Sequence, residues 1–217
     1  MIPVLIIPIL TKPELLYALL DSINYPVGHL VVIDNGGCVD TSELTEHADK
    51  WCREITHLPL PTNLGVAAAW NLGIKLTPHA PWWMVSNFDV TFGGNALEMF
   101  DHMTRRDRVT LSHDSPEWCC FTVGDEVVAK VGLFDEGFYP AYFEDWDYRD
   151  RCNAAELPVR YTDIRVGHAN SSTLSHFPHR NDISWPSNEA YYRDKVARAD
   201  RSEGRWSITR RRANSWD

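Results

Sequence analysis

One apolar stretch of the sequence ends in side chains that could bind a metal ion. Trp82 to Val90 reads Trp-Trp-Met-Val-Ser-Asn-Phe-Asp-Val and predicts a buried strand ending at Asn87 and Asp89. In an extended chain, side chains two positions apart lie on the same side. A carboxylate at the carboxyl end of a strand lies where open α/β sheets bind ligands, and its oxygens suit Mg²⁺ or Mn²⁺ carrying a phosphate. The alternative is a turn that only caps the next helix.

A second stretch places three acids among aromatic residues. Tyr142-Phe143 and Trp146 surround Glu144, Asp145 and Asp147. Apolar surroundings raise the pKa of a carboxyl group, and such a carboxylate is the usual general base for a hydroxyl. We predict this role for Asp145. For Glu144 and Asp147 a helix amino end, where acids interact favourably with the dipole, remains an alternative.

Alternating strands and helices are needed to position these residues. Apolar runs predict buried strands, and the residues between them predict helices. A Thr11–Glu14 capping box with Pro13 in the first turn predicts the first helix, and Asp40 and Glu43 can cap a second that ends near Cys52. The remaining predicted elements are strands at Val4 to Ile7, Leu30 to Ile33, Ile55 to Leu60, Val109 to Ser112, Cys119 to Val123 and Val159 to Thr162, and helices at Asn63 to Ile74, Asn95 to Met103 and Asp125 to Val131. The pattern predicts an α/β fold with a mostly parallel sheet.

Composition narrows the possible partners and compartments. The chain of 217 residues is 44% hydrophobic, which is typical of a globular protein, and its net charge of −9 argues against nucleic acid as the main partner. Five cysteines without zinc-like spacing predict free thiols in a reducing, cytoplasmic compartment. The apolar start from Ile2 to Leu10 is too short for a membrane span and is interrupted by Pro3 and Pro8.

The last 25 positions are rich in basic residues. They contain eight of the 21 in the chain: Arg193, Lys195, Arg198, Arg201, Arg205, Arg210, Arg211 and Arg212. This segment could contact an acidic acceptor, a membrane surface or another subunit of a homo-oligomer. The other interpretation is a solvated, partly mobile end.

Several motifs in order resemble the inverting glycosyltransferases of the GT-A fold, family 2, particularly rhamnosyltransferase-like and bacteriophage-borne members. The resemblance covers about Pro3 to His168, and a fainter match continues through Asn188-x-x-Tyr191-Tyr192-x-x-Lys195. It rests on Asp34-Asn35-Gly36, Asn63-Leu64-Gly65 to Asn71-Leu72-Gly73, the Asn87-Phe88-Asp89 variant of Asp-x-Asp, Phe134-Asp135-Glu136, Phe143-Glu144-Asp145-Trp146-Asp147 and His168. It implies a GT-A domain over residues 1–175, with a nucleotide-sugar half at 1–92, an acceptor and catalytic half at 93–175, and a helical, basic tail at 176–217.

The resemblance also implies roles for individual residues. Asp34 would hydrogen-bond the base of a UDP- or dTDP-type sugar donor, with the loop after Ile7, including Pro8 and Ile9, beneath it. Asp89 would bind the divalent cation, Mn²⁺ or Mg²⁺, and Asp145 would be the general base beside Glu144. His168 would be a further metal ligand or diphosphate contact. The other implied donor contacts are Asn35, Asn63, Gly65, Asn71 and Asn87.

The sequence departs from the family pattern at Asn87, where many relatives have Asp. Without that charge the protein holds a cation less strongly, so the diphosphate is expected to bring much of the binding. A strict metal requirement therefore stays open.

The acceptor site is the least defined part of the sequence. Candidate residues are Trp118, Tyr142 and Trp146, with Tyr139 and Trp185 as further aromatics; such rings stack on sugars but also fill cores. The acceptor would be a protein, for a phage enzyme a virion protein in the host cytoplasm, or a glycan. The alternative function is a non-catalytic module that binds a sugar nucleotide or glycan. A nucleotidylyltransferase would need a Gly-rich basic loop, and a Rossmann oxidoreductase a Gly-x-Gly-x-x-Gly motif, after the first strand; neither is present.

Overall fold

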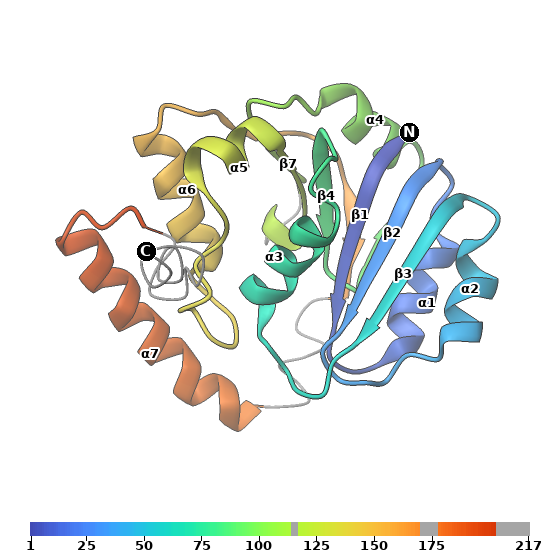
Figure 1. The fold of residues 1–217 in the computed structure, drawn as a ribbon, viewed down its shortest axis with the longest axis horizontal. Helices are drawn as coiled ribbons and strands as arrows, with labels where there is room; N and C mark the ends of the chain where they lie inside the picture. Colours follow the sequence, from blue (N-terminus) through green and yellow to red (C-terminus); the bar gives the residue numbers. More distant parts are fainter. Residues whose placement is uncertain (114–116, 170–177, 203–217) are drawn as a thin grey trace, which may run out of the picture.

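The computed structural model describes residues 1–113, 117–169 and 178–202 (Figure 1). Its elements, in chain order, are β1 (Ile2–Ile9), α1 (Pro13–Asp21), β2 (Val27–Asp34), α2 (Thr41–Ala48), β3 (Cys52–Pro59), α3 (Val66–Leu76), β4 (Trp82–Ser86), β5 (Val90–Phe92), α4 (Ala96–Met103), β6 (Val109–Leu111), the short 3-10 helix η1 (Glu117–Cys119), β7 (Cys120–Gly124), α5 (Asp125–Val131), α6 (Glu144–Ala154), β8 (Val159–Tyr161), β9 (Val166–His168) and α7 (Pro178–Ala197).

The central sheet has seven strands in the order β3-β2-β1-β4-β7-β6-β8. Strands β3, β2, β1 and β4 are parallel, as is the β6–β8 pair, whereas β7 runs antiparallel to both of its neighbours. The mostly parallel α/β fold predicted from the sequence is therefore confirmed. Strands β1, β2 and β4 end at one edge, and that edge is where ligands bind in such sheets.

Two hydrophobic cores cover the two faces of the sheet. On one face, Leu16 and Leu20 of α1 and Leu44 of α2 pack against alternate residues of β1 and β2. On the other face, Trp70 of α3 and Tyr148 of α6 pack against the remaining strand residues. Figure 1 shows α1 and α2 on the opposite side of the strands from α3. Strands with both faces buried explain the uninterrupted apolar runs in the sequence.

Some predicted boundaries are wrong. Helix α1 is preceded by Lys12 in a left-handed conformation, with φ 58° and no side-chain cap, so the Thr11–Glu14 capping box does not form. Pro13 starts the helix directly, which places the cap position one residue after Thr11. Asp40 does cap α2 through the N–H groups of Ser42 and Glu43, but this helix ends at Ala48 because Cys52 already belongs to β3.

Helix α7 forms the far side of the molecule from α2 (Figure 1). Lys195, one of the basic residues predicted to be solvated, is only 1% exposed. Residues 176–177 and 203–217 of the predicted tail, including Trp206 and Trp216, lie outside the described residues. Among the helices that the structure describes, none has both the length and the apolar character needed to cross a bilayer.

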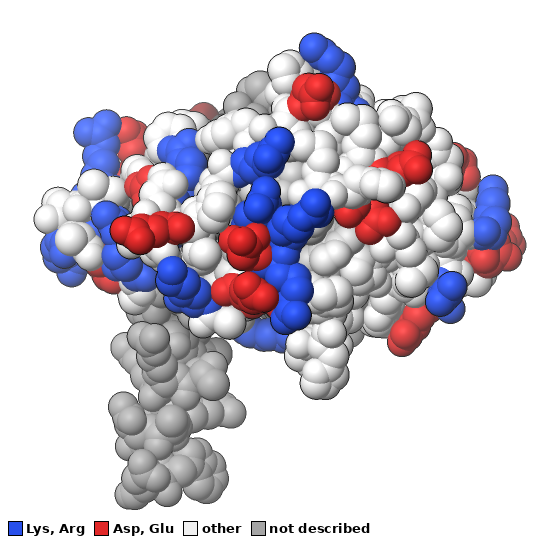
Figure 2. Space-filling model, turned by 90° about the horizontal axis from the view of Figure 1, so that it is seen from above, with Lys and Arg blue, Asp and Glu red and all other residues white. Residues whose placement is uncertain are grey.

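The face of the molecule that lies at the top of Figure 1 carries both positive and negative side chains. Figure 2 shows basic and acidic side chains beside one another on this face. The exposed Arg106 side chain pairs with Asp125 at 2.6 Å and with Glu126 at 3.5 Å. Neighbouring acids offset much of the charge that a basic surface would offer to a polyanion.

Candidate functional site

Asp34 ends β2 with a fully buried carboxylate. It accepts hydrogen bonds from the N–H groups of Gly36, Cys38 and Val39 at 2.9–3.2 Å, and His57 Nε2 lies 3.4 Å away. Burial would raise the pKa of Asp34, but these backbone donors and His57 lower it below its usual value. In the structure this carboxylate holds the turn after β2, and its contact with a nucleobase stays a prediction.

The turn after β2 packs tightly against the end of β1. The Asn35 N–H donates to Ile9 O at 2.8 Å, and a Cβ on Gly36 would lie 1.9 Å from Leu10 O, so no larger residue fits there. Pro8 and Ile9 are buried residues of β1, which continues past Ile7; the loop predicted to begin there starts later. The Asn35 side chain accepts from Leu64 N at 3.1 Å and thus joins this turn to the loop before α3.

The strand that begins at Trp82 ends at Ser86, earlier than predicted, and this changes the setting of Asn87 and Asp89. Both lie in the turn between β4 and β5 and not in an extended strand. Phe88 and Val90 are buried, which explains the continued apolar pattern. The Asn87 N–H donates to Cys119 O at 2.7 Å, so the turn is fixed to the last residue of η1, directly before β7.

Asp89 and His168 are brought together by the small antiparallel sheet of β5 and β9. Val90 pairs with His168, and the Ala169 N–H donates to Asp89 O at 3.0 Å. His168 Nε2 lies 3.1 Å from Asp89 Oδ1, with side chains 7% and 6% exposed. A carboxylate and an imidazole in contact are a suitable pair of ligands for a divalent cation.

Asp89 and His168 could bind a metal ion that receives only part of its coordination from the protein. No group of three or more His, Cys, Asp and Glu side chains within residues 1–113, 117–169 and 178–202 could hold a metal ion. Mg²⁺ at a phosphate substrate typically uses one or two carboxylates, with water and phosphate oxygens supplying the rest. Asp89 and His168 meet that smaller requirement.

Loop residues 137–140 cover the amino end of α3. The Val66 N–H donates to Pro140 O at 2.8 Å, and Tyr139 OH donates to Asn63 O at 3.2 Å. Gly65 has φ 87°, and a Cβ there would lie 2.9 Å from Pro140 O. The loop thus uses one of the backbone donors that helix starts offer to anions. The predicted contacts of Asn63 and Gly65 with the donor stay predictions.

Asn71 clamps α3 to the segment after α5. Its Nδ2 donates to Phe134 O at 2.9 Å and to Glu136 Oε1 at 2.8 Å, while its Oδ1 accepts from Phe134 N at 2.9 Å. Both amide hydrogens are thus engaged inside the protein. The structure gives Asn71 this positioning role, and its contact with a sugar nucleotide stays a prediction.

Helix α6 begins at Glu144, so all three acids lie in its first turn. The Glu144 Oε2 is buried and has no hydrogen-bond partner among the described residues. Burial, followed by the nearby Asp145 charge, raises the pKa of Glu144 well above its usual value. Asp145 is partly exposed and is therefore the carboxylate that a substrate can reach. Figure 1 shows that α6 starts on the side toward which β1, β2 and β3 point.

The aromatic residues proposed for the acceptor divide into core and surface. Trp118 is 6% exposed and packs edge-on against Phe121 at 4.9 Å, so the structure places it in the core, and its predicted acceptor role stays a prediction. Trp146 is 44% exposed beside the α6 start, and Trp185 of α7 is 43% exposed. Tyr142 lies 4.9 Å from the Trp185 ring and is half-buried. These three residues form a surface to which both α6 and α7 contribute.

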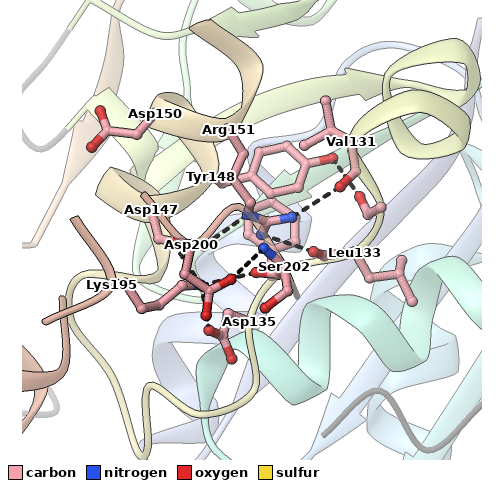
Figure 3. Close-up of polar contacts among 12 residues, drawn as sticks. Val131, Leu133, Asp135, Asp147, Tyr148, Asp150, Arg151, Lys195, Asp200 and Ser202 are labelled. Carbon is pink, nitrogen blue, oxygen red and sulfur yellow. Dashed lines mark hydrogen bonds and ion pairs between the residues drawn. The ribbon is translucent and has the colours of Figure 1, made fainter. Parts of the chain in front are cut away.

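A buried ion cluster that sequence reasoning missed lies behind this surface. Lys195 Nζ lies 2.6 Å from Asp135 and 2.7 Å from Asp147, and Arg151 Nε lies 2.8 Å from Asp147 (Figure 3). The one related signal in the sequence was the fainter family match through Asn188-x-x-Tyr191-Tyr192-x-x-Lys195, which did not indicate any partner for Lys195. His57 was also missed, because a histidine within a strand carries no signal for the carboxylate it will meet.

Solved structures of glycosyltransferases have the same fold. Neither a protein-family model nor a curated protein sequence matches the chain. Similar structures include a Pyrobaculum calidifontis mannosyltransferase with GDP-Man and Mn²⁺ (TM-score 0.58, 14% identity, 74% of this chain and 54% of that one), S. aureus TarS 1-349 with UDP-GlcNAc (0.56, 16%, 79% and 61%) and GalNAc-T7 with UDP, GalNAc and Mn²⁺ (0.62, 12%, 88% and 50%). The chain thus spans between half and three fifths of the proteins it resembles. At these identities the comparison establishes a shared fold of the GT-A type.

Proposed function

We propose that this protein is a glycosyltransferase that moves a sugar from a nucleoside diphosphate donor to an acceptor hydroxyl with inversion, as in family 2. The observation that carries the proposal is the Asp89–His168 pair, 3.1 Å between Oδ1 and Nε2, which joins the turn after β4 to the end of β9 in a GT-A fold. Two of the similar structures hold Mn²⁺ with a nucleotide or nucleotide sugar. A carboxylate–imidazole pair is the chemistry expected where such a donor meets a cation.

Asp89 and His168 would hold the divalent cation, with Asn87 in the same turn beside the diphosphate. When bound, the cation would offset the negative charge on the departing diphosphate. Asn87 adds no charge, so the two other side chains carry the protein's share of the coordination. Two main-chain hydrogen bonds hold this turn in place, from Asn87 N to Cys119 O and from Ala169 N to Asp89 O.

Asp145 would act as the general base. It is the exposed member of the acidic pair in the first α6 turn, whereas Glu144 is buried with a raised pKa and is protonated over a wider pH range. The acceptor hydroxyl would lose its proton to Asp145 as its oxygen forms the bond to the anomeric carbon and the bond to the diphosphate breaks. One displacement of this kind inverts the anomeric configuration. Glu144 would position Asp145 through the helix start that they share.

The acceptor would approach across Tyr142, Trp146 and Trp185. These aromatic rings lie next to the Asp145 end of α6, and exposed Trp rings offer flat faces to sugars and to peptides. A glycan or a protein, for a phage enzyme a virion protein, is the proposed acceptor class.

The test is incubation of the purified protein with UDP-, dTDP- and GDP-sugars, with and without Mn²⁺, while released nucleotide is measured. Mn²⁺-stimulated release from one donor is expected, and the product formed with an added acceptor should have the inverted anomeric configuration. Binding of a sugar nucleotide without release under any condition would favour a non-catalytic binding module. A retained configuration would contradict the single displacement.

A further inference from the structure

Helix α7 contacts the acidic segment through residues on one helical face. Asn188, Tyr191 and Lys195 are three, four and seven positions apart, so they lie on the same side of the helix. Asn188 Nδ2 donates to Ala141 O at 2.7 Å, and Tyr191 OH donates to Asp135 Oδ2 at 2.9 Å. This face therefore packs against the chain that leads into α6.

Lys195 is the buried centre of these contacts. Its Nζ donates to Asp135 Oδ2 at 2.6 Å and to Ser202 O at 2.9 Å, and it lies 2.7 Å from Asp147 Oδ1. The side chains of Lys195, Asp135 and Asp147 are 2%, 0% and 4% exposed. With Arg151 on Asp147, two carboxylates are balanced by two cations in the interior, as Figure 3 shows. Removing one partner of such a cluster leaves an uncompensated buried charge.

Lys195 joins two carboxylates, Asp135 and Asp147, that belong to different segments. In the proposed reaction these two segments must be aligned with each other. Asp135 follows Phe134, whose main chain is hydrogen-bonded to Asn71 of α3. Helix α3 belongs to the predicted nucleotide-sugar half of the chain. Asp147 lies in the first turn of α6, two residues beyond Asp145. Lys195 thus fixes the first turn of α6 relative to α3.

We infer that Lys195 is a positioning residue for the general base: by joining Asp135 to Asp147 it holds the first turn of α6, and Asp145 with it, in register with the donor half. This inference rests on the proposed function. Lys195 is buried and reaches no substrate, so it acts through the helix that it holds. Helix α7 is accordingly a component of the catalytic unit.

The test compares Lys195→Met with Arg193→Met. Arg193 lies on the same helix but is 76% exposed and pairs with Glu189 of its own helix. At a temperature at which circular dichroism shows both variants folded, Lys195→Met is expected to lower kcat for nucleotide release at least tenfold while the donor KM stays within about twofold. Arg193→Met should leave both constants within twofold of the wild type. A folded Lys195→Met with wild-type kcat would refute the inference.

A double variant separates positioning from charge balance. Asp135→Asn combined with Lys195→Met removes one acid and one base, so folding should recover even if the single variant unfolds. The inference requires kcat to stay low in this double variant. Recovery of both stability and kcat would show that Lys195 only neutralises Asp135, and would overturn a positioning role.

Hydrogen exchange supplies a measurement that does not depend on activity. The amides of residues 144–148 should exchange at least tenfold faster in the double variant than in the wild type, while those of β1 stay unchanged. If the wild type releases no nucleotide from any donor, the proposed function fails, yet this experiment still shows whether Lys195 holds α6. Unchanged exchange at 144–148 would refute the anchoring itself.

Discussion

His168 Nε2 lies 3.1 Å from Asp89 Oδ1 although 79 positions separate the two residues in the chain. The contact depends on β5 and β9, two strands of three residues each that pair outside the central sheet. The predicted nucleotide-sugar half, residues 1–92, and the end of the predicted acceptor and catalytic half, residues 93–175, therefore meet at this pair. Each half alone would provide only one of the two proposed ligands.

Replacement of His168 by Gln should weaken metal binding without unfolding the protein. Loss of one of two protein ligands is expected to raise the Mn²⁺ concentration for half-maximal nucleotide release by about tenfold or more. His102→Gln is the matched control because the His102 side chain is 71% exposed and faces only Glu98 in the described contacts, at 3.9 Å. Identical Mn²⁺ titrations for wild type and His168→Gln would contradict the assignment.

Replacement of Asp145 by Asn should leave donor binding nearly intact and lower turnover by roughly a hundredfold or more, because a general base contributes on this scale. Calorimetric binding of UDP with Mn²⁺ and the rate of nucleotide release measure the two effects separately. Asp107→Asn, at an exposed acid two residues before β6, is the control. Turnover near the wild-type value would remove Asp145 from the mechanism.

The raised pKa of Glu144 predicts how stability depends on pH. Because the folded form holds this proton more tightly than the unfolded form, stability should fall as pH rises above the ordinary value of 4.5 toward the raised folded pKa. Glu144→Gln should remove this decline and be more stable than the wild type at pH 8, because the amide of Gln is never ionised in this buried setting.

Urea unfolding at pH 5 and pH 8 measures this difference, with the exposed Glu46→Gln as the control. If Glu144→Gln is instead less stable at pH 8, the Glu144 carboxylate has a charged partner and the interpretation is incorrect.

Asn71→Ala should destabilise the protein by about 1–3 kcal/mol, because Phe134 N, Phe134 O and Glu136 lose their hydrogen-bond partner in a mostly buried setting. Denaturant unfolding of this variant, compared with Asn153→Ala at an exposed position of α6, measures the loss. Equal stabilities would mean that the clamp between α3 and the Phe134 segment is replaced by water without cost.

The sequence pattern predicted the scaffold well because burial on both faces leaves a direct signal. The apolar runs of β1 and β2 were recognisable for that reason, and α5 also has the predicted bounds Asp125–Val131. The strand starting at Trp82 was predicted too long, since Phe88 and Val90 are buried by a second sheet whose partner strand is distant in the chain. Apolar spacing alone does not distinguish burial within the central sheet from burial by the second sheet of β5 and β9.

The site was predictable in its residue types but less so in its contacts. Asp89 and His168 were expected to share a ligand, and the structure places them in contact. Lys195, in contrast, lies in a basic segment whose composition indicates solvent exposure. Its burial depends on Asp135 and Asp147, and no local pattern shows that these acids will meet a lysine that follows them by 60 and 48 positions.

The pairing of β5 with β9 also determines when the proposed enzyme can first act during its own synthesis. Ribosomes add roughly 5–20 residues per second, so the 79 positions between Asp89 and His168 correspond to a delay of about 4 to 16 s. Over that interval the nascent chain contains the first four strands of the sheet but lacks one of the two proposed cation ligands. The proposed cation site is therefore incomplete until β9 has been synthesised.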